Sequence, residues 1–392
     1  MNSCTVAYAF YESDFRVRRY AEVLAKRGGR TDAIALRADG MSRTETIKGV
    51  RLYRIQRRNF DSQGGPLDYF AKMLLFFIKS SMIILVNHIR NPYKIIIVHN
   101  VPDFFVFTAI IPRLTGTKII LDIHDILPEL FCERFSKPLN SPYAMLLRII
   151  EKYSVHFSHF VIAGNDLWRR KIAERNRYPV ERCIGFINYS HVEYFEGIRH
   201  SFIPGRLSII YPGHLSYHHG VDIAIRAMPT VLARVPQATF SIYASSWIPD
   251  YRARLERLIV DLNLMHAVCI HEALTIQELV EVYKSIDIGI VPKRGGFFAS
   301  EAFSSKILDF MASGIPIVAS RTTVDEFYFD DSMIKFFEID NPADCAFKIL
   351  DLYENPEKMV LLSDHGRRYA AANTWDIKKK DFEAIVDTLT KE

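Results

Sequence analysis

Five polar side chains lie close together in the chain, just ahead of a glycine turn and an apolar run: Glu301, Ser304, Ser305, Lys306 and Asp309. Ser304 or Ser305 is a good N-cap residue for a helix over residues 304–313. Gly314 suits the left-handed position just past the end of such a helix, and Pro316 prevents its continuation. The pattern predicts a loop, a short helix, a turn and a strand.

The charged members of this group indicate what such a helix start could bind. Backbone N–H groups at a helix N-terminus bind anions, and Lys306 would add a positive charge there. Glu301 precedes the helix, where it could accept hydrogen bonds from a ligand's hydroxyl groups. Asp309 lies more than a turn inside the helix and could reach a second diol, such as a ribose. The group therefore predicts a site for a diphosphate that carries hydroxyl-bearing groups.

A second polar group follows an apolar run at 208–211. Gly213 would let the backbone approach a ligand closely, and His214 and His219 flank the start of another expected helix. An imidazole has a pKa near ~6.5, so its positive charge at neutral pH is weak. We expect Lys293 and Arg294, with the lysine named above, to supply charge that the histidines lack. The alternative, that both histidines are ordinary polar loop residues, stays open.

A third group ends the apolar run at 119–121. His124 and Asp125 follow Asp122 at the expected end of a strand, where ligands of parallel sheets bind. The strand-end location and the flanking acids Asp122 and Asp125 favour a functional His124, although a lone histidine can also be structural. Arg16 stands in a basic segment after the first strand, where it would either meet an acceptor phosphate or simply face water.

Short apolar runs alternate with amphipathic stretches along the whole chain, which favours parallel sheets covered by helices on both faces. In the first half the expected strands are Val6–Phe10, Ala33–Leu36, Ile95–Val98, Ile119–Leu121 and Phe160–Ala163. The pattern restarts after Pro204-Gly205, which marks a break. We therefore expect an α/β chain of two Rossmann-like, doubly wound domains, over residues 1–200 and 201–374, with a last helix over 375–392.

These motifs resemble the donor-site signature of the retaining family-four glycosyltransferases with the GT-B fold. Glu301 and Asp309 stand at the positions of that family's two acids, eight residues apart, and Met311-Ala312-Ser313-Gly314-Ile315-Pro316 matches the turn that follows. Asp122-Ile123-His124-Asp125, followed by Pro128-Glu129, matches its Asp-x-His-(Glu/Asp)-x-x-Pro-Glu segment. At His214 and His219 the family usually has an Arg and a Lys.

The resemblance implies two domains facing across a cleft, with the last helix crossing back to the first domain. It implies transfer of a hexose-type sugar from a nucleotide-diphosphate sugar to an acceptor hydroxyl, with retention, in polysaccharide or glycolipid synthesis. Glu301 would hold the donor sugar, Asp309 the ribose, and His124 would lie beside the reaction centre. No cofactor and no metal are expected. The nucleotide, whether UDP, GDP or ADP, stays open.

Two other functions stay open at this stage. A sugar-nucleotide epimerase shares the fold, and a non-catalytic glycosyltransferase-like subunit would explain His214 and His219. A dehydrogenase is not expected, because Tyr11-Glu12-Ser13-Asp14 follows the first strand where a Gly-x-Gly-x-x-Gly turn would be needed.

The charge is unevenly distributed between the two halves. Residues 1–200 hold 30 Lys+Arg and 19 Asp+Glu, a net charge of +11. The whole chain has a net charge of +5, so the remaining residues have a net charge of −6. A basic half suits an anionic partner, and we expect a peripheral contact with an anionic membrane rather than with nucleic acid. The acceptor would then be a glycan or a lipid-linked saccharide. The alternative is a set of solvated basic faces and a soluble acceptor.

The location follows from the cysteines and the apolar segments. The five cysteines form no close pair, so a disulfide framework is not expected. We therefore expect the protein in the cytoplasm, at the inner face of the membrane. The start of the chain does not resemble a signal peptide. The longest apolar stretch, Met73 to Val86, is shorter than the ~20 residues that a membrane span needs. Lys72 and Lys79 would share one face of a helix there.

Overall fold

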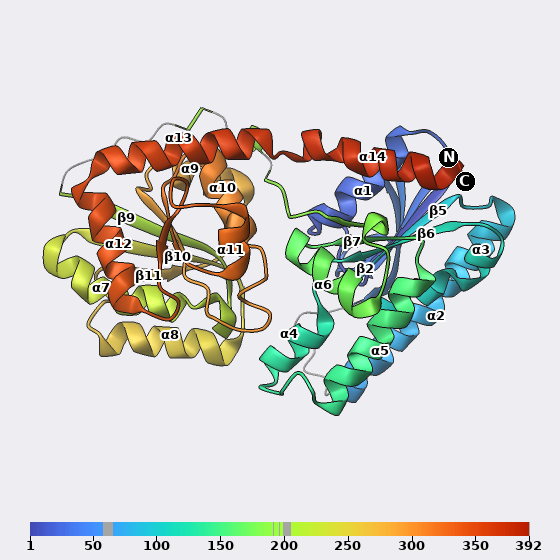
Figure 1. Ribbon diagram of the computed structural model, residues 1–392, viewed down its shortest axis with the longest axis horizontal. Coiled ribbons are helices and arrows are strands. Elements are labelled where there is room, and N and C mark those ends of the chain that lie inside the picture. The colour runs from blue at the N-terminus through green and yellow to red at the C-terminus, as the bar shows by residue number, and fades with distance from the viewer. Residues whose placement is uncertain (58–65, 191, 196, 199–204, 392) are drawn as a thin grey trace. The chain divides into compact units, whose positions relative to one another are not determined.

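The computed structural model describes residues 1–57, 66–190, 192–195, 197–198 and 205–391 (Figure 1). The chain forms two compact units, residues Met1–Ile187 with Lys379–Glu392 (unit 1) and residues Asn188–Lys378 (unit 2). Each unit is built on one largely parallel sheet, and helices lie on both sides of each sheet. The doubly wound α/β architecture predicted from the alternation of apolar and amphipathic runs is therefore observed twice.

The sheet of unit 1 has eight strands in the order β3-β4-β2-β1-β5-β6-β7-β8, all parallel except for the antiparallel pair β3 and β4. Their bounds are β1 Ser3–Val6, β2 Thr31–Arg37, β3 Thr44–Ile47, β4 Val50–Arg57, β5 Ile95–His99, β6 Lys118–Ile123, β7 Phe160–Ala163 and β8 Cys183–Gly185. The first strand was predicted over Val6–Phe10 and lies earlier. Its polar residues are compatible with burial because Ser3 and Thr31, on neighbouring strands, share a hydrogen bond of 2.9 Å between their hydroxyls.

The helices of unit 1 include short 3₁₀ turns, written η. They are α1 Phe15–Lys26, α2 Pro66–Arg90, η1 Asp103–Ala109, α3 Ile110–Leu114, α4 Leu127–Arg134, α5 Pro142–Phe157, α6 Asp166–Asn176 and η2 Val180–Arg182. Asp14 starts α1 by accepting hydrogen bonds from the backbone N–H groups of Arg16 and Val17. The apolar helix α2 is longer than the predicted apolar stretch at both ends.

The sheet of unit 2 has six parallel strands in the order β11-β10-β9-β12-β13-β14. Their bounds are β9 Leu207–Leu215, β10 Ala238–Trp247, β11 Val268–His271, β12 Ile288–Val291, β13 Ile317–Ser320 and β14 Lys335–Phe337. The helices are η3 Val192–Tyr194, η4 Tyr217–His219, α7 Val221–Arg234, α8 Pro249–Asp261, α9 Ile276–Tyr283, α10 Ser305–Ser313, α11 Thr323–Tyr328, α12 Pro342–Glu354 and α13 Pro356–Ala372.

The division between the units lies at Asn188, earlier than the expected boundary near residue 200. The residues after it already pack on unit 2, since the ring of Phe195 stacks on Tyr283 with 5.8 Å between centroids. Pro204, part of the expected break, lies outside the described residues.

The last helix, α14 Trp375–Lys391, starts in unit 2, and its residues from Lys379 onward belong to unit 1. There Phe382 is fully buried and stacks on Tyr20 of α1, with 4.7 Å between centroids. Arg27, at the end of α1, pairs with Asp387.

Candidate functional site

The start of α10 in unit 2 is the helix N-terminus that the sequence singled out. Ser304 is buried and occupies the N-cap position, while Ser305, the first helical residue, is exposed. Gly314 adopts the left-handed conformation (φ +73°) and ends the helix, as predicted. Within the described part of the chain, Ser304 makes no side-chain capping bond to the N–H groups of the first turn. These donors suit an anionic ligand.

Gly213 and Lys306 occupy adjoining space beside this helix start. Gly213 has a φ of +152°, and a Cβ added to it would lie 2.2 Å from Cε of Lys306. The ammonium of Lys306 lies 5.1 Å from the ring centroid of Tyr211. Burial and the nearby Lys293 lower the pKa of Lys306 to about 8, against the opposing effect of Asp309. The lysine thus remains largely charged at neutral pH, close to the N-terminus of α10.

The histidines cluster around the turn between β9 and α7. The rings of His214 and His219 lie 5.8 Å apart, and those of His218 and His219 lie 4.4 Å apart. Nδ1 of His214 and the hydroxyl of Ser246 are 2.7 Å apart. Burial, followed by the charge of Lys306, lowers the pKa of His219 well below its ordinary value. His219 is therefore a neutral imidazole at neutral pH, so it offers a ligand a hydrogen bond and not a charge.

Lys293 and Arg294 were expected to add charge for a ligand, and the structure places both in ion pairs within unit 2. The ammonium of buried Lys293 lies 2.8 Å from Oδ2 of Asp325 and donates to the carbonyl oxygen of Ala302 at 3.0 Å. Arg294 pairs with Asp222 and with Asp340. These ion pairs link the segment between β12 and α10 to α11, to α7 and to Asp340.

One of the two predicted acids, Glu301, precedes α10, and the other, Asp309, lies within it. Glu301 is half-buried in the turn before α10, where its backbone N–H donates to the carbonyl of Phe298 at 3.0 Å. The half-buried Asp309 accepts a hydrogen bond of 2.6 Å from the hydroxyl of Ser190. Ser190, which lies just after the start of unit 2 at Asn188, was not predicted from the sequence. The structure thus brings Glu301, Lys306 and Asp309 together on one loop and helix.

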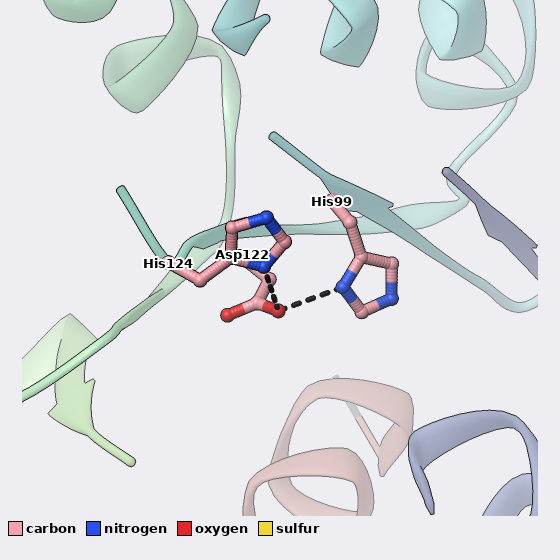
Figure 2. A group of neighbouring side chains, drawn as sticks. All are labelled: His99, Asp122 and His124. Carbon is pink, nitrogen blue, oxygen red and sulfur yellow. Dashed lines mark hydrogen bonds and ion pairs between the residues drawn. The ribbon is translucent and has the colours of Figure 1, made fainter. Parts of the chain in front are cut away.

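In unit 1 a buried carboxylate organises the end of β6 (Figure 2). Asp122 is fully buried, and its oxygens accept hydrogen bonds from Arg16 at 2.7–3.1 Å and from Nδ1 of His99 at 2.7 Å. Nδ1 of His124 lies 3.8 Å from the same carboxylate. Burial alone would raise the pKa of Asp122, but Arg16 and His99 hold it below its ordinary value. The aspartate is therefore ionised and orients the residues around it.

Arg16 does not occupy the acceptor-side position expected for it. Its side chain is buried, and besides Asp122 it donates to the carbonyl oxygens of Phe186 at 2.6 Å and Ala163 at 3.4 Å. These bonds join α1 to the ends of β6, β7 and β8. An acceptor phosphate would have to displace all of them, so Arg16 is a structural residue here.

Asn100 fixes the loop that carries His124 and Asp125. Its side-chain oxygen accepts hydrogen bonds from both backbone N–H groups, at 3.0 and 3.4 Å, and its amide donates to the carbonyl of Asp125 at 2.6 Å. Burial raises the pKa of half-buried Asp125, although His124 lowers it in part. His99 and Asn100 were missed from the sequence; the apolar run before them was the available signal for a strand end.

The geometry of His99, Asp122 and His124 would allow a cation, since their ligand atoms all lie within 4.8 Å of one another. A divalent cation would, however, stand against the guanidinium of Arg16, which already occupies both oxygens of Asp122. The cluster therefore does not fit a metal ion, because the carboxylate charge is already neutralised.

Two family models match the chain. The model described as "Glycosyl transferase 4-like domain" matches residues 14–184, and the model "Glycosyl transferases group 1" matches residues 206–355. An uncharacterised glycosyltransferase of Methanocaldococcus jannaschii is 23% identical over 313 residues, 73% of this chain and 83% of that protein. A second one from the same organism is 34% identical over 112 residues, 29% of this chain and only 26% of its own length.

Solved structures share the fold over the whole chain. Sucrose-phosphate synthase from Thermosynechococcus elongatus has a TM-score of 0.72 and 16% identity, and the match covers 100% of this chain and 98% of that one. HepE from Anabaena, in complex with UDP and glucose, has a TM-score of 0.70 and 14% identity, with 100% of both chains covered. The fold is GT-B, as the motifs predicted.

The chain belongs to the group 1, family-four type of glycosyltransferases. The family resemblance stated from the motifs is confirmed, since both matching models describe glycosyltransferases.

Proposed function

We propose that the protein transfers a hexose-type sugar from a nucleotide-diphosphate sugar to an acceptor hydroxyl, with retention of the anomeric configuration. The observation that carries the proposal is the arrangement of Gly213, Lys306 and the start of α10. Gly213 leaves space for the lysine, and the lysine lies at an uncapped helix N-terminus. This combination of charge and N–H donors suits a diphosphate. The solved structures with UDP and with UDP-glucose, which share the fold, support the same ligand class.

The leaving diphosphate gains negative charge as the bond between sugar and oxygen breaks. Donors that already point at it stabilise this charge more in the transition state than in the ground state, which speeds the reaction. Lys306 and the N–H groups of α10 take this role, with Ser304 and Ser305 at the helix start. Glu301 holds hydroxyl groups of the sugar. Asp309, oriented by Ser190, holds the ribose.

Unit 1 contributes His124, on the loop fixed by Asn100, as the residue beside the reacting sugar, with Asp125 on the acceptor side. His214 and the neutral His219 contribute hydrogen bonds to the diphosphate. We infer that no metal takes part, since the diphosphate charge is met by Lys306 and the helix terminus. The acceptor is a glycan or a lipid-linked saccharide in polysaccharide or glycolipid synthesis. The reaction takes place in the cytoplasm, at the inner face of the membrane.

The experiment is a titration calorimetry and hydrolysis screen of the purified chain with UDP-, GDP- and ADP-sugars. We expect one nucleotide class to bind, with slow release of sugar to water or fast transfer once a suitable acceptor is added. The anomeric configuration of the product, read by nuclear magnetic resonance, tests retention. Binding of no nucleotide sugar would overturn the proposal.

A non-catalytic partner subunit is the second candidate, and the neutral imidazole of His219 favours it, because a strong phosphate clamp would be charged. The same screen separates the two functions. A subunit would bind a sugar nucleotide weakly or not at all, and it would not release sugar. An epimerase of the same fold would convert the nucleotide sugar in the absence of any acceptor.

A further inference from the structure

Helix α2 exposes most of its apolar side chains. In the most apolar 18-residue stretch of Asp68–Arg90, only 17% of the residues are buried, and Met82 and Ile89 are 61% and 72% exposed. The exposed apolar residues of α2 are Tyr69, Phe70, Leu74, Leu75, Ile78, Met82, Val86 and Ile89. A contiguous apolar surface of this extent on a folded protein indicates a binding surface.

By length and composition, Asp68–Arg90 is the one helix in the described residues that could cross a membrane, so the expectation of a segment too short to span was wrong. Its packing argues for a different position. Phe76 is fully buried, with 5.1 Å between its ring centroid and that of Tyr8, and 5.5 Å to that of Phe105. His88 lies 2.8 Å from the hydroxyl of Thr115 and accepts from the backbone N–H of Tyr93. If α2 crossed a membrane, Phe76 and His88 would lose these contacts with the rest of unit 1.

The apolar surface continues onto α3 and α5. Both α2 and α5 pack against η1, and Arg113 of α3 donates to the carbonyl of Phe157, the last residue of α5, at 2.8 Å (Figure 1). The exposed apolar residues of these two helices are Ile110, Ile111 and Leu114 on α3, and Tyr143, Met145, Leu146, Ile149 and Tyr153 on α5. We call the exposed apolar residues of α2, α3 and α5 the apolar face.

A basic groove borders the apolar face at α5. It is a cavity of about 540 Å³ whose lining includes one residue of the apolar face, Ile149, and the cations Arg148, Lys152, Lys171 and Arg175. Arg175 is neutralised by Glu129 and Glu151. Arg148 and Lys152, by contrast, are exposed and form no ion pair within the part of the chain that the structure describes. Positive charge therefore stands directly beside exposed apolar side chains.

We propose that the apolar face docks unit 1 onto a bilayer that contains anionic phospholipids, with α2 lying in the plane of the interface. The apolar side chains enter the acyl boundary, and Arg148 and Lys152 meet the phosphates of the lipid headgroups. The tyrosines of α2 and α5 suit the headgroup level, because their rings are apolar and their hydroxyls polar. This proposal goes beyond the sugar transfer and does not depend on it.

The test is sedimentation of the full chain with vesicles of phosphatidylcholine alone and of phosphatidylcholine mixed with phosphatidylglycerol. We expect binding to the anionic vesicles that weakens with added salt, because the lipid charges are screened. The variant Arg148→Glu plus Lys152→Glu should lose at least about tenfold in vesicle affinity, since each basic residue near such a surface adds substantially to binding. The variant Met82→Glu plus Ile89→Glu should lose a similar factor, because glutamates would enter the acyl boundary.

Matched controls lie in unit 2, where Arg254→Glu plus Arg257→Glu and Val360→Glu plus Leu361→Glu change exposed residues of the same kinds. Both controls should bind vesicles as the unchanged protein does. All four variants should keep their thermal unfolding midpoint and their release of sugar from a soluble donor. The proposal fails if the unchanged protein does not bind anionic vesicles at low salt. It also fails if Arg148→Glu plus Lys152→Glu and Met82→Glu plus Ile89→Glu bind these vesicles as well as the unchanged protein does. It also fails if light scattering shows a dimer that Met82→Glu plus Ile89→Glu dissociates, since a second copy would then cover the face.

Discussion

The backbone of Gly213 and the side chain of Lys306 occupy one packed space in unit 2, so that a Cβ at position 213 would lie 2.2 Å from Cε and 2.8 Å from Nζ of the lysine. The side chain of Lys306 can take this position only because position 213 has no side chain. Position 213 thus controls where the positive charge of the proposed diphosphate site stands.

We expect Gly213→Ala to weaken donor binding about 10- to 100-fold, because it displaces a charged hydrogen-bond donor from the diphosphate. Titration calorimetry with the best nucleotide sugar measures the change. Gly205→Ala is the matched control, since Gly205 also has a positive φ (+84°) but no atom within 4 Å of the added Cβ. Equal donor affinity in both variants would show that Lys306 does not bind the diphosphate.

The pH dependence of donor affinity should follow Lys306. Burial and Lys293 lower the pKa of this lysine to about 8, so its ammonium is charged below that pH and neutral above it. Donor affinity should therefore fall as the pH rises through about 8. Lys306→Arg should flatten the upper part of the profile, because an arginine stays charged. A profile that is unchanged in Lys306→Gln would contradict this assignment.

The start of α10 was predictable because its signals are local. Serines before the helix and Gly314 after it determined its ends, which the structure places at Ser305 and Ser313. The apolar strands were predictable for the same reason, because their signals are also local. Glu301 and Asp309 could be assigned to one site from local sequence, since they are close in the chain.

The surroundings of these residues could not be predicted, because they come from distant parts of the chain. Arg16 and Asp122 are 106 positions apart, and their pairing turns an expected acceptor contact into a buried structural bond. Lys293 likewise meets Asp325 across the loop before α10. An isolated cation in a sequence carries no sign of the carboxylate that neutralises it in the fold.

The proposed contact between Glu301 and the donor sugar can be tested by substitution. We expect Glu301→Ala to lower turnover by about 10²-fold or more while folding stays intact, because it removes a polar contact that counts in the transition state. Steady-state kinetics and a thermal melt measure the two effects. Glu281→Ala, an exposed glutamate of α9, is the control and should retain full turnover. Near-normal turnover in Glu301→Ala would reject the donor-site assignment.

Chelation tests the inference that no metal takes part. Since Lys306 and the N–H groups of α10 stand where a cation would otherwise be needed, transfer should continue at an unchanged rate after dialysis against EDTA. The measurement is the initial rate before and after chelation, and after addition of Mg²⁺ or Mn²⁺. A loss of activity that these ions restore would show that the diphosphate is bound through a metal.

The buried pair of Arg16 and Asp122 should be essential for the stability of unit 1. Asp122→Ala leaves the guanidinium of Arg16 without its carboxylate, and breaking a buried pair in this way costs about 3–5 kcal/mol. Replacement of both residues, as Arg16→Met plus Asp122→Ala, removes both charges, so it should cost less than the sum of the single replacements Arg16→Met and Asp122→Ala. Chemical denaturation of the four proteins measures this coupling. Glu354→Ala, which breaks the exposed pair with Arg234, should cost about 0–1 kcal/mol and serves as the control. If the double variant lost as much as the two single variants together, Arg16 and Asp122 would act independently, and the carboxylate would owe its position to His99 instead.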